Sequence, residues 1–290
     1  EGRSASAWVD LMVGELKTFA NLQMLPRSTA FGYYDHNFIG ILERRSDHQS
    51  LSAATGTRQR LHRVRAKRVV LATGAFERPL VFAHNDIPGV MQASSVSTYV
   101  NRYGVAPGSR MVLFTCNDSA YQTALDWHAA GRTVVAIVDS RAAPSGAIFA
   151  AVEALGMAVM LGCAVIEAQG GKRVKRALVA PINAEGTEVA GPVRRIACDL
   201  IACSGGWSPA IHLSSHTGAK PQWDEAIVGF RPGASTQQEC SAGACAGTYR
   251  LAECFAEGAL AGAQAAHKAG FGDGVGLFAQ PPVEEHDESP

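Results

Sequence analysis

Two short apolar runs that end in small residues are the clearest signs of ligand chemistry in the sequence. One run ends in Ala72-Thr73-Gly74, and the other, 199–206, ends in Ser204-Gly205-Gly206. Ligands of open α/β sheets bind beyond the carboxyl ends of the strands, where glycine lets a phosphate come close to the backbone. We therefore expect the two strand ends to converge on one nucleotide-binding groove. Ordinary strand-to-loop turns would give the same pattern and remain an alternative.

The turn Thr115–Ala120 could be a second nucleotide-binding element. It lies between a strand expected at 111–115 and a helix expected at 119–130. Dinucleotide folds carry G-x-G-x-x-G/A in such a turn, so that the pyrophosphate reaches the helix N-terminus. Thr115 and Asn117 replace the first two glycines, and Asp118 adds negative charge. We therefore expect a Rossmann-type unit that lacks tight nucleotide binding.

Two acids near this turn have alternative roles. Asp139 ends the next expected strand, about 20 residues on, where an acid would hold a ribose hydroxyl. Because the glycines are missing, we favour a solvated strand end for Asp139. Asp118 and Ser119 are expected to be N-cap residues of the helix.

The cysteines offer a rival chemistry. Cys240 and Cys245 are close enough in sequence to form the dithiol of a disulfide reductase. Such a thiol needs a helix N-terminus or a cation to lower its pKa, and Glu239 would oppose this. Cys198 and Cys203 are expected to fill apolar space rather than to bind a metal ion with His212.

The sequence shows no nucleophile–base pair, no paired carboxylates in a supporting context and no metal-ligand cluster. We therefore predict no catalytic residue and no metal site in this chain.

The elements that would position these residues alternate along the middle of the chain. Strands are expected at 111–115, 133–139 and 157–161, with helices at 119–130 and 145–155 between them, an order that predicts a doubly wound parallel sheet. Around them we expect a helix that includes Trp8 and Leu16, a hairpin turning at 35–37, an edge strand at 58–65, a helix at 94–103, a hairpin turning at Gly170-Gly171, and a final helix at 249–267.

These elements suggest one domain interrupted by another. Residues 1–90 and 205–270 are expected to form a partial dinucleotide-binding domain with a common sheet, and 91–204 an inserted Rossmann-like domain. Residues 271–290 are rich in Gly, Pro and acids, which favours a tail or linker. Because the helical pattern starts within the first residues, we expect the sequence to begin inside a longer protein.

Composition limits the classes of partner. Lys plus Arg and Asp plus Glu number 26 each, so no net charge draws the chain to nucleic acid or to a membrane surface. No apolar run approaches the roughly 20 residues that a membrane helix needs. The seven cysteines are scattered and odd in number, unlike a secreted disulfide scaffold. We expect a cytoplasmic protein that binds neither nucleic acid nor membrane.

At Ala72–Phe82 and Asn85–Met91 the sequence becomes specific to one family. With Thr29–Asn37, Ser204–Pro209 and Leu251–Gly258, it resembles the alpha subunit of heterotetrameric sarcosine oxidase along nearly its whole length. The resemblance implies an α/β fold of the FAD/NAD(P)-binding, disulfide-oxidoreductase-like type, incomplete and interrupted by a second Rossmann-like domain. The sequence departs from the family pattern by lacking an upstream strand with G-x-G-x-x-G and a C-terminal folate-binding region.

The resemblance also implies an activity and an assembly. The complex would demethylate sarcosine oxidatively to glycine, passing the one-carbon unit to tetrahydrofolate and reducing oxygen to hydrogen peroxide. The alpha subunit would bind NAD and assemble with beta, gamma and delta subunits, while FMN and FAD would also be held in the complex. The amine-oxidising site would lie on the beta subunit, so this chain alone is expected to be inactive.

By resemblance, Thr73 and Gly74 would line the pyrophosphate side of the cofactor, and Ala30, expected at a strand end, would lie near the adenine. The full set of implied cofactor contacts is Ala30, Ala72, Thr73, Gly74, Gly243 and Gly247. FAD-binding relatives often have an acid before the last helix that bonds the ribityl chain. Gly243-Ala244-Cys245 offers none, which favours NAD over FAD.

Two other functions remain open. The degenerate turn at 115–120 favours a noncatalytic scaffold or binding subunit of a related amine or opine oxidase. The Cys240 and Cys245 pair would instead suit a pyridine nucleotide-disulfide reductase.

Overall fold

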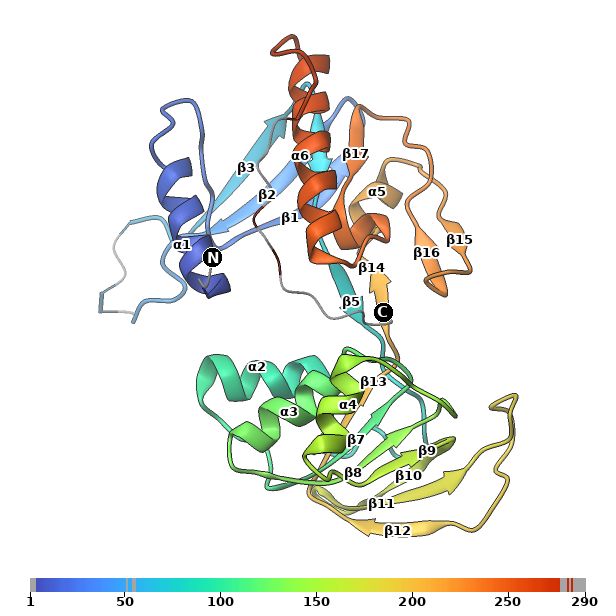
Figure 1. Cartoon of the computed structure of the whole chain (residues 1–290). Helices are drawn as coiled ribbons and strands as arrows, with labels where there is room; N and C mark the ends of the chain where they lie inside the picture. The colour runs from blue at the N-terminus through green and yellow to red at the C-terminus, as the bar shows by residue number, and fades with distance from the viewer. Residues whose placement is uncertain (1–3, 51, 54–55, 277–280, 282, 284–290) are drawn as a thin grey trace. The chain divides into compact units, whose positions relative to one another are not determined.

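The computed structural model describes residues 4–50, 52–53, 56–276, 281 and 283. Its internal contacts divide the chain into two compact units (Figure 1). Unit 1 takes its described residues from 1–74, 209–224 and 230–283, and unit 2 consists mainly of 75–208 with 225–229. The structure therefore assigns 75–90 and 205–208 to unit 2, whereas the sequence pattern joins them to the first domain. Most of the expected tail at 271–290 lies outside the described residues.

Unit 1 begins with helix α1 (Ala5–Leu16) and a three-stranded antiparallel sheet. Its strands are β1 (Ser28–Tyr34), β2 (Phe38–Arg44) and β3 (Gln59–Arg65), in that order. The predicted hairpin at 35–37 is confirmed, since Tyr34 pairs with Phe38. His36 and Asn37 both have a positive φ in the turn, a conformation that asparagine tolerates better than most residues.

A parallel pair of strands joins the two ends of unit 1. Strand β4 (Val69–Leu71) pairs with β17 (Glu239–Ser241), in the register Val69 with Glu239. After β17 come a 3₁₀ turn (Gly243–Ala246) and helix α6 (Leu251–Lys268). The rest of unit 1 comprises helix α5 (His212–His216) and a hairpin of β15 (Gln222–Asp224) and β16 (Gly229–Arg231), whose turn belongs to unit 2.

The side chain of Asn37 ties the β1–β2 turn to the start of β17. Its Oδ1 accepts hydrogen bonds from the Tyr33 hydroxyl at 2.8 Å and from the backbone N–H of Gln238 at 2.9 Å. Its Nδ2 donates to the carbonyl oxygens of Lys67 and Gln238, at 3.2 Å each. An asparagine side chain offers two acceptor and two donor positions, and buried Asn37 uses all four.

Unit 2 contains a five-stranded parallel sheet with the predicted alternation of strands and helices. The strand order is β6 (Val90–Gln92), β13 (Leu200–Ser204), β7 (Arg110–Thr115), β8 (Thr133–Asp139) and β9 (Val159–Leu161). Helices α2 (Ala93–Tyr103), α3 (Tyr121–Ala129) and α4 (Ala147–Ala154) cover one face of this sheet (Figure 1). The buried side chains between them include Met111, Leu113, Trp127, Ile137, Val152 and Leu200.

A second, antiparallel sheet covers the other face of the parallel sheet. It consists of β10 (Cys163–Gly170), β11 (Val174–Pro181) and β12 (Arg194–Ala197). The apolar layer between the two sheets includes Val112, Phe114, Val138, Val165, Val179 and Ile201. Alternate residues of β7 thus enter opposite cores, which explains why its residues 111–114 are all apolar. Strands β5 (Ala75–Glu77) and β14 (Trp207–Pro209) form a separate pair.

The expectation that the two glycine-ended strands share a groove is wrong. Strand β4 pairs with β17 in unit 1, whereas β13 lies between β6 and β7 in the sheet of unit 2. An apolar run ending in glycine is typical of any buried parallel strand, so the pattern does not specify which sheet the strand joins.

Candidate functional site

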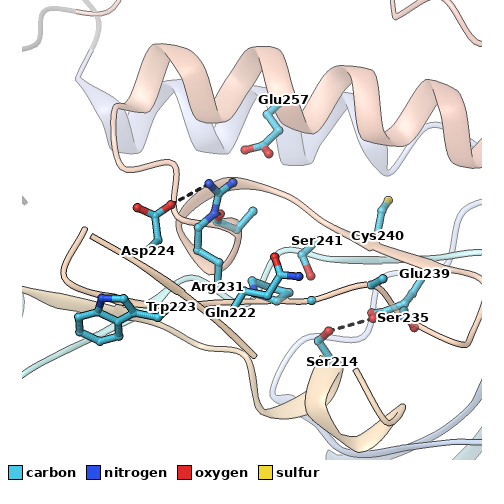
Figure 2. A pocket seen from close by; sticks show the side chains of 14 residues that line it. Ser214, Gln222, Trp223, Asp224, Arg231, Ser235, Glu239, Cys240, Ser241 and Glu257 are labelled. Atoms are coloured by element: carbon cyan, nitrogen blue, oxygen red, sulfur yellow. Dashed lines mark hydrogen bonds and ion pairs between the residues drawn. The ribbon is translucent and has the colours of Figure 1, made fainter. Parts of the chain in front are cut away.

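A cavity of about 520 Å³ opens in unit 1 beside β17, the β15–β16 hairpin and helix α6 (Figure 2). Ligand pockets in proteins commonly measure about 300–1,000 Å³. The lining is mostly polar, and its principal side chains are Ser214, Trp223, Asp224, Arg231, Ser235, Glu239, Ser241 and Glu257. Its size and polarity make this cavity the candidate functional site.

Arg231 is held in a fixed orientation at one wall of the cavity. Its Nε donates to the carbonyl oxygen of Ala246 at 2.7 Å, and its Nη1 pairs with Asp224 Oδ2 at 3.0 Å. Gly247 has φ +94°, and a Cβ there would come within 3.0 Å of Arg231 Nε. Position 247 therefore requires glycine because the Arg231 side chain lies close to its backbone.

Glu257 reaches from α6 toward the loop that follows β17 (Figure 2). Its Oε2 accepts the backbone N–H of Gly243 at 2.8 Å. Gly243, with φ +74°, is one of the predicted cofactor contacts. The N–H group that an anionic ligand would use is thus already bound to a carboxylate of the same chain.

Glu239 presents one satisfied and one unsatisfied carboxylate oxygen. Ser214 Oγ donates to its Oε1 at 3.0 Å (Figure 2). Its Oε2 is buried and receives no hydrogen bond from the described part of the chain. Burial, together with the negative charge of Glu239, raises the pKa of the neighbouring Tyr33 to about 12. Glu239 therefore brings a carboxylate to the cavity lining, but its buried Oε2 has no surface open to a ligand.

Trp223 adds an aromatic surface at the cavity. Its ring meets that of Phe230 edge to face, with ring centroids 5.2 Å apart and planes at 73°. Trp223 is 48% exposed, and its ring points away from Glu239 and Ser241 (Figure 2).

The six predicted cofactor contacts lie near this cavity only in part. Gly243 and Gly247 flank Ala246, which lines it. Thr73 Oγ1 donates to the carbonyl oxygen of Ala210 at 2.9 Å, and Gly74 accepts the N–H of the same residue. The hydroxyl of Thr73 is therefore engaged within unit 1.

The other two predicted contacts are not cavity-lining residues. Ala72 is exposed just beyond β4. Ala30 is expected at a strand end, but it lies within β1, where it pairs with Ile41. The expectation fails because the strand begins only at Ser28 and continues to Tyr34.

The principal cavity residues have no assigned role in the sequence pattern. Glu239 stands out there only as a neighbour of Cys240 and Glu257 only as part of the family segment Leu251–Gly258, and Arg231 does not stand out at all. The feature of the sequence that could have indicated the cavity is the clustering of Trp223, Asp224 and Arg231 around one short hairpin. Without knowledge of the pairing of β17 with β4, that signal cannot be related to a cavity.

In unit 2, side chains of the degenerate turn bond to one another and to the end of β13. Asn117 Nδ2 donates to the Ser204 carbonyl oxygen at 3.2 Å and to its Oγ at 3.0 Å. Ser119 Oγ donates to Asn117 Oδ1 at 2.7 Å and accepts from Trp207 Nε1 at 2.9 Å. The polar side chains of the turn are thus engaged in hydrogen bonds within unit 2.

Asp139 is fully buried, so the expected solvated strand end is wrong. It accepts hydrogen bonds from Arg141 Nη2 at 2.8 Å and from the Tyr121 hydroxyl at 2.6 Å. Arg141 Nη1 also pairs with Asp118 Oδ1 at 2.7 Å. Burial alone would lower the pKa of Arg141, but the two acids outweigh it and raise that pKa. An arginine of the chain thus neutralises the acid that would hold a ribose.

The expected N-cap at Asp118 and Ser119 is also wrong. The N-cap of α3 is Ala120, which makes no side-chain capping bond. Asp118 instead forms an ion pair with Arg141.

The cysteines do not form a reactive pair. Cys245 is buried, and its Sγ donates to the Leu71 carbonyl oxygen at 3.1 Å. Partial burial raises the pKa of the Cys240 thiol, which opposes thiolate formation. Cys198 and Cys203 are buried, as predicted. Among the described residues, no group of metal-ligating side chains is close enough to hold an ion, and no helix is long and apolar enough to cross a membrane.

Sequence comparison confirms the predicted resemblance. The chain is 39% identical to the sarcosine oxidase alpha chain of Corynebacterium sp. (strain P-1) over 93% of its own length, which is 28% of that protein. It is 42% identical to the sarcosine oxidase alpha chain of Rhizobium meliloti (strain 1021), over 89% of the chain and 25% of that protein. An opine oxidase subunit from the latter organism is 28% identical over 59% of the chain and 41% of its own length. The chain thus spans about a quarter of the sarcosine oxidase proteins it matches, and no family model matches it.

Comparison with solved structures confirms the predicted fold class. L-proline dehydrogenase from P. horikoshii superposes with a TM-score of 0.64 at 20% identity, over 94% of this chain and 47% of that one. Thioredoxin reductase from T. acidophilum gives a TM-score of 0.61 at 15% identity, over 87% and 77%. The chain has an α/β fold of the FAD/NAD(P)-binding, disulfide-oxidoreductase-like type.

Proposed function

We propose that this chain is part of the alpha subunit of a heterotetrameric sarcosine oxidase and that unit 1 binds NAD for the complex. The observation that carries the proposal is the identity of 39–42% with the alpha chains of sarcosine oxidases over about nine tenths of the chain. The cavity of about 520 Å³ in unit 1 is large enough to receive part of a dinucleotide. The complex would convert sarcosine to glycine, with tetrahydrofolate accepting the one-carbon unit and oxygen being reduced to hydrogen peroxide.

The cavity residues fit some parts of NAD better than others. Ser241, in the cavity lining, can bond a ribose hydroxyl, whereas the Oε2 atom of Glu239 is buried. Arg231 is the guanidinium at the cavity, but Asp224 already balances its charge. NAD supplies a hydride acceptor when it is bound. The residues of this chain would bind and orient the cofactor, with Ala72, Thr73, Gly74, Gly243, Gly247 and Ala30 as further proposed contacts.

In this proposal the amine is oxidised on the beta subunit, with gamma and delta subunits, FMN and FAD completing the complex. The test is to assay the purified chain alone and after assembly with the partner subunits. We expect sarcosine-dependent hydrogen peroxide formation only from the assembly. Turnover by the chain alone would overturn the assignment of oxidation to a partner.

A calorimetric titration with NAD and with FAD tests the cofactor separately. We expect NAD to bind with a stoichiometry near one per chain, since the degenerate turn of unit 2 is closed by its own side chains. Binding of FAD in place of NAD would contradict the cofactor assignment without affecting the assignment to the sarcosine oxidase complex.

A subunit of an opine oxidase is the second candidate. It is supported by the 28% identity with an opine oxidase subunit over 59% of the chain. Oxidation of an opine rather than of sarcosine by the assembled complex would favour it. A disulfide reductase is disfavoured, because Cys245 is buried and bonded to the Leu71 carbonyl oxygen.

A further inference from the structure

We infer that strand β3 of unit 1 pairs, through its free edge, with an extended acidic segment of a partner subunit. β3 is the outer strand of the β1–β2–β3 sheet, and within the described part of the chain it pairs with β2 alone. The identity of the partner rests on the proposed function, which places the chain in an oxidase of several subunits. The chemistry of the edge does not depend on that proposal.

The edge of β3 carries backbone groups that can pair with another strand. The N–H of Ala66 donates to the carbonyl oxygen of Asn37 at 3.1 Å. Because backbone direction alternates along a strand, the even-numbered residues of β3 face β2, whereas Leu61, Arg63 and Arg65 direct their N–H and C=O groups outward. The strand keeps its register with β2 over seven residues, without the bulge or proline that often protects an edge.

The side chains along this edge are basic. Arg63 and Arg65 are exposed, and neither forms an ion pair with the residues that the structure describes. Residues 27–68 contain nine lysines and arginines against three acids, although the whole chain has no net charge. Two copies of β3 paired edge to edge would bring their arginines together, and like charges on facing strands are destabilising. The charge therefore selects an acidic strand over a second copy of this chain.

The outer face of the same sheet adds apolar surface beside the edge. Leu61 is 60% exposed, and Phe31 and Tyr34 are each 49% exposed. The ring of Phe31 covers Gly40, where a Cβ would come within 2.6 Å of it. Gly40 pairs with Arg63, so this ring and the arginine lie on one face. Arginines that served only to keep an edge in solution would not require exposed apolar side chains next to them.

The pleat of β3 determines the pattern of the added strand. Arg63 and Arg65 lie on the exposed face, and Val64 between them is half-buried on the other face. Facing side chains of neighbouring strands have their Cβ atoms about 4.5–5.5 Å apart. The partner segment would therefore alternate acidic side chains, opposite the arginines, with apolar ones, opposite Val64. This is recognition by addition of a strand to a sheet edge.

The test titrates the full chain with a fluorescent peptide that alternates glutamate with valine and matches the seven residues of β3 in length. We expect binding by fluorescence anisotropy, together with protection of the Arg63 N–H from hydrogen exchange. A peptide with lysine in place of glutamate should not bind. Methylation of the backbone nitrogens on one edge of the Glu–Val peptide retains its charge but removes the edge hydrogen bonds, and should weaken binding about tenfold.

Arg63→Glu combined with Arg65→Glu should also weaken binding of the peptide about tenfold. Arg194→Glu combined with Arg195→Glu is the matched control, because these exposed arginines lie on β12, an edge strand of unit 2. The control should leave the affinity unchanged, and thermal melting should confirm that both variants are folded. Equal losses in the two double variants, full affinity of the methylated peptide, or tighter binding of an oligothymidylate than of the peptide would each overturn the inference.

The same double variants, made in the longer subunit, test the source of the acidic strand. The β3 variant should assemble with the partner subunits about tenfold more weakly than wild type in analytical ultracentrifugation, and the β12 variant should assemble normally. Normal assembly of the β3 variant would overturn the assignment to a partner subunit. If the wild-type subunit does not assemble, the proposed function itself fails, and with it the identity of the partner.

Discussion

The carboxylate of Glu257 accepts the backbone N–H of Gly243 at 2.8 Å, joining helix α6 to the loop after β17. This bond fixes a loop whose glycine has a positive φ and whose neighbour Ala246 lines the cavity. Glu257 therefore acts both on the shape of the cavity and on its charge.

Glu257→Ala should destabilise the protein by about 1–2 kcal/mol, because it removes a charge-assisted hydrogen bond. Glu257→Gln should retain most of that stability, since the amide oxygen can still accept the N–H of Gly243. Urea denaturation measures both changes. Glu253→Ala, an exposed position one turn earlier on α6, should have little effect. Equal losses at 253 and 257 would contradict a specific role for the bond.

Asn37→Ala should cost about 2–4 kcal/mol, because four hydrogen bonds between the β1–β2 turn and the start of β17 are lost in a buried site. Asn37→Gly loses the same bonds but suits φ +52° better. Chemical denaturation should therefore rank the glycine variant between wild type and alanine. A wild-type unfolding midpoint for Asn37→Ala would refute this account.

Asp139→Asn should destabilise the protein by about 2–3 kcal/mol. Removing one partner of a fully buried ion pair costs about 3–5 kcal/mol, but the Arg141 side chain is 26% exposed and keeps its pair with Asp118. Thermal and urea unfolding of the variant measure the loss. Asp86→Asn, at an exposed position of the same unit, should change stability little.

The Glu43–His62 pair should make stability depend on pH. The hydrogen bond from His62 is the main cause that lowers the pKa of Glu43 from its usual value. A lowered pKa in the folded state stabilises the protein above the unfolded-state pKa of about 4.3, and this contribution is lost as the pH falls through the folded value. The stability difference between wild type and Glu43→Gln should therefore shrink below about pH 4. A difference independent of pH would argue against this coupling.

Val228→Asn should stabilise the protein by about 1 kcal/mol. Val228 has φ +46°, which is strained for a β-branched side chain, and it is exposed in the β15–β16 turn. Asparagine tolerates this conformation, and the carbonyl oxygen that accepts from Arg78 Nη1 remains. Val228→Thr keeps the β-branch and should give no gain. Differential scanning calorimetry can compare the two variants.

The sequence predicts those elements whose own residue types show whether they are buried or form a turn. Strands β7 and β13 are apolar because both faces of their sheet are covered, and the hairpin at 35–37 has local turn chemistry. Strand β17 is not predicted, because Glu-Cys-Ser shows no alternation of apolar and polar residues. The strand is recognised only from its pairing with Val69 and its neighbours, which are far away in the sequence.

The cavity cannot be predicted for the same reason. The acceptor role of Glu239 depends on Ser214, and the orientation of Arg231 depends on Ala246, and neither contact follows from spacing along the chain. The missing glycines predict only that the degenerate turn lacks tight nucleotide binding. The identity of the closing groups, Asn117 with Ser204 and Asp139 with Arg141, requires the packing of β7, β8 and β13.

The parallel pairing of Val69 with Glu239 constrains the order in which the polypeptide can fold. Strands β4 and β17 come from opposite sides of the inserted unit 2, so their association must close a very long loop, at an entropic cost. Prior folding of unit 2, which pairs β5 with β14, would bring those distant segments together and lower that cost. Unit 2 would thus help unit 1 to fold by holding the two segments close together. Destabilising substitutions in the core of unit 2 should therefore also impair formation of the cavity in unit 1.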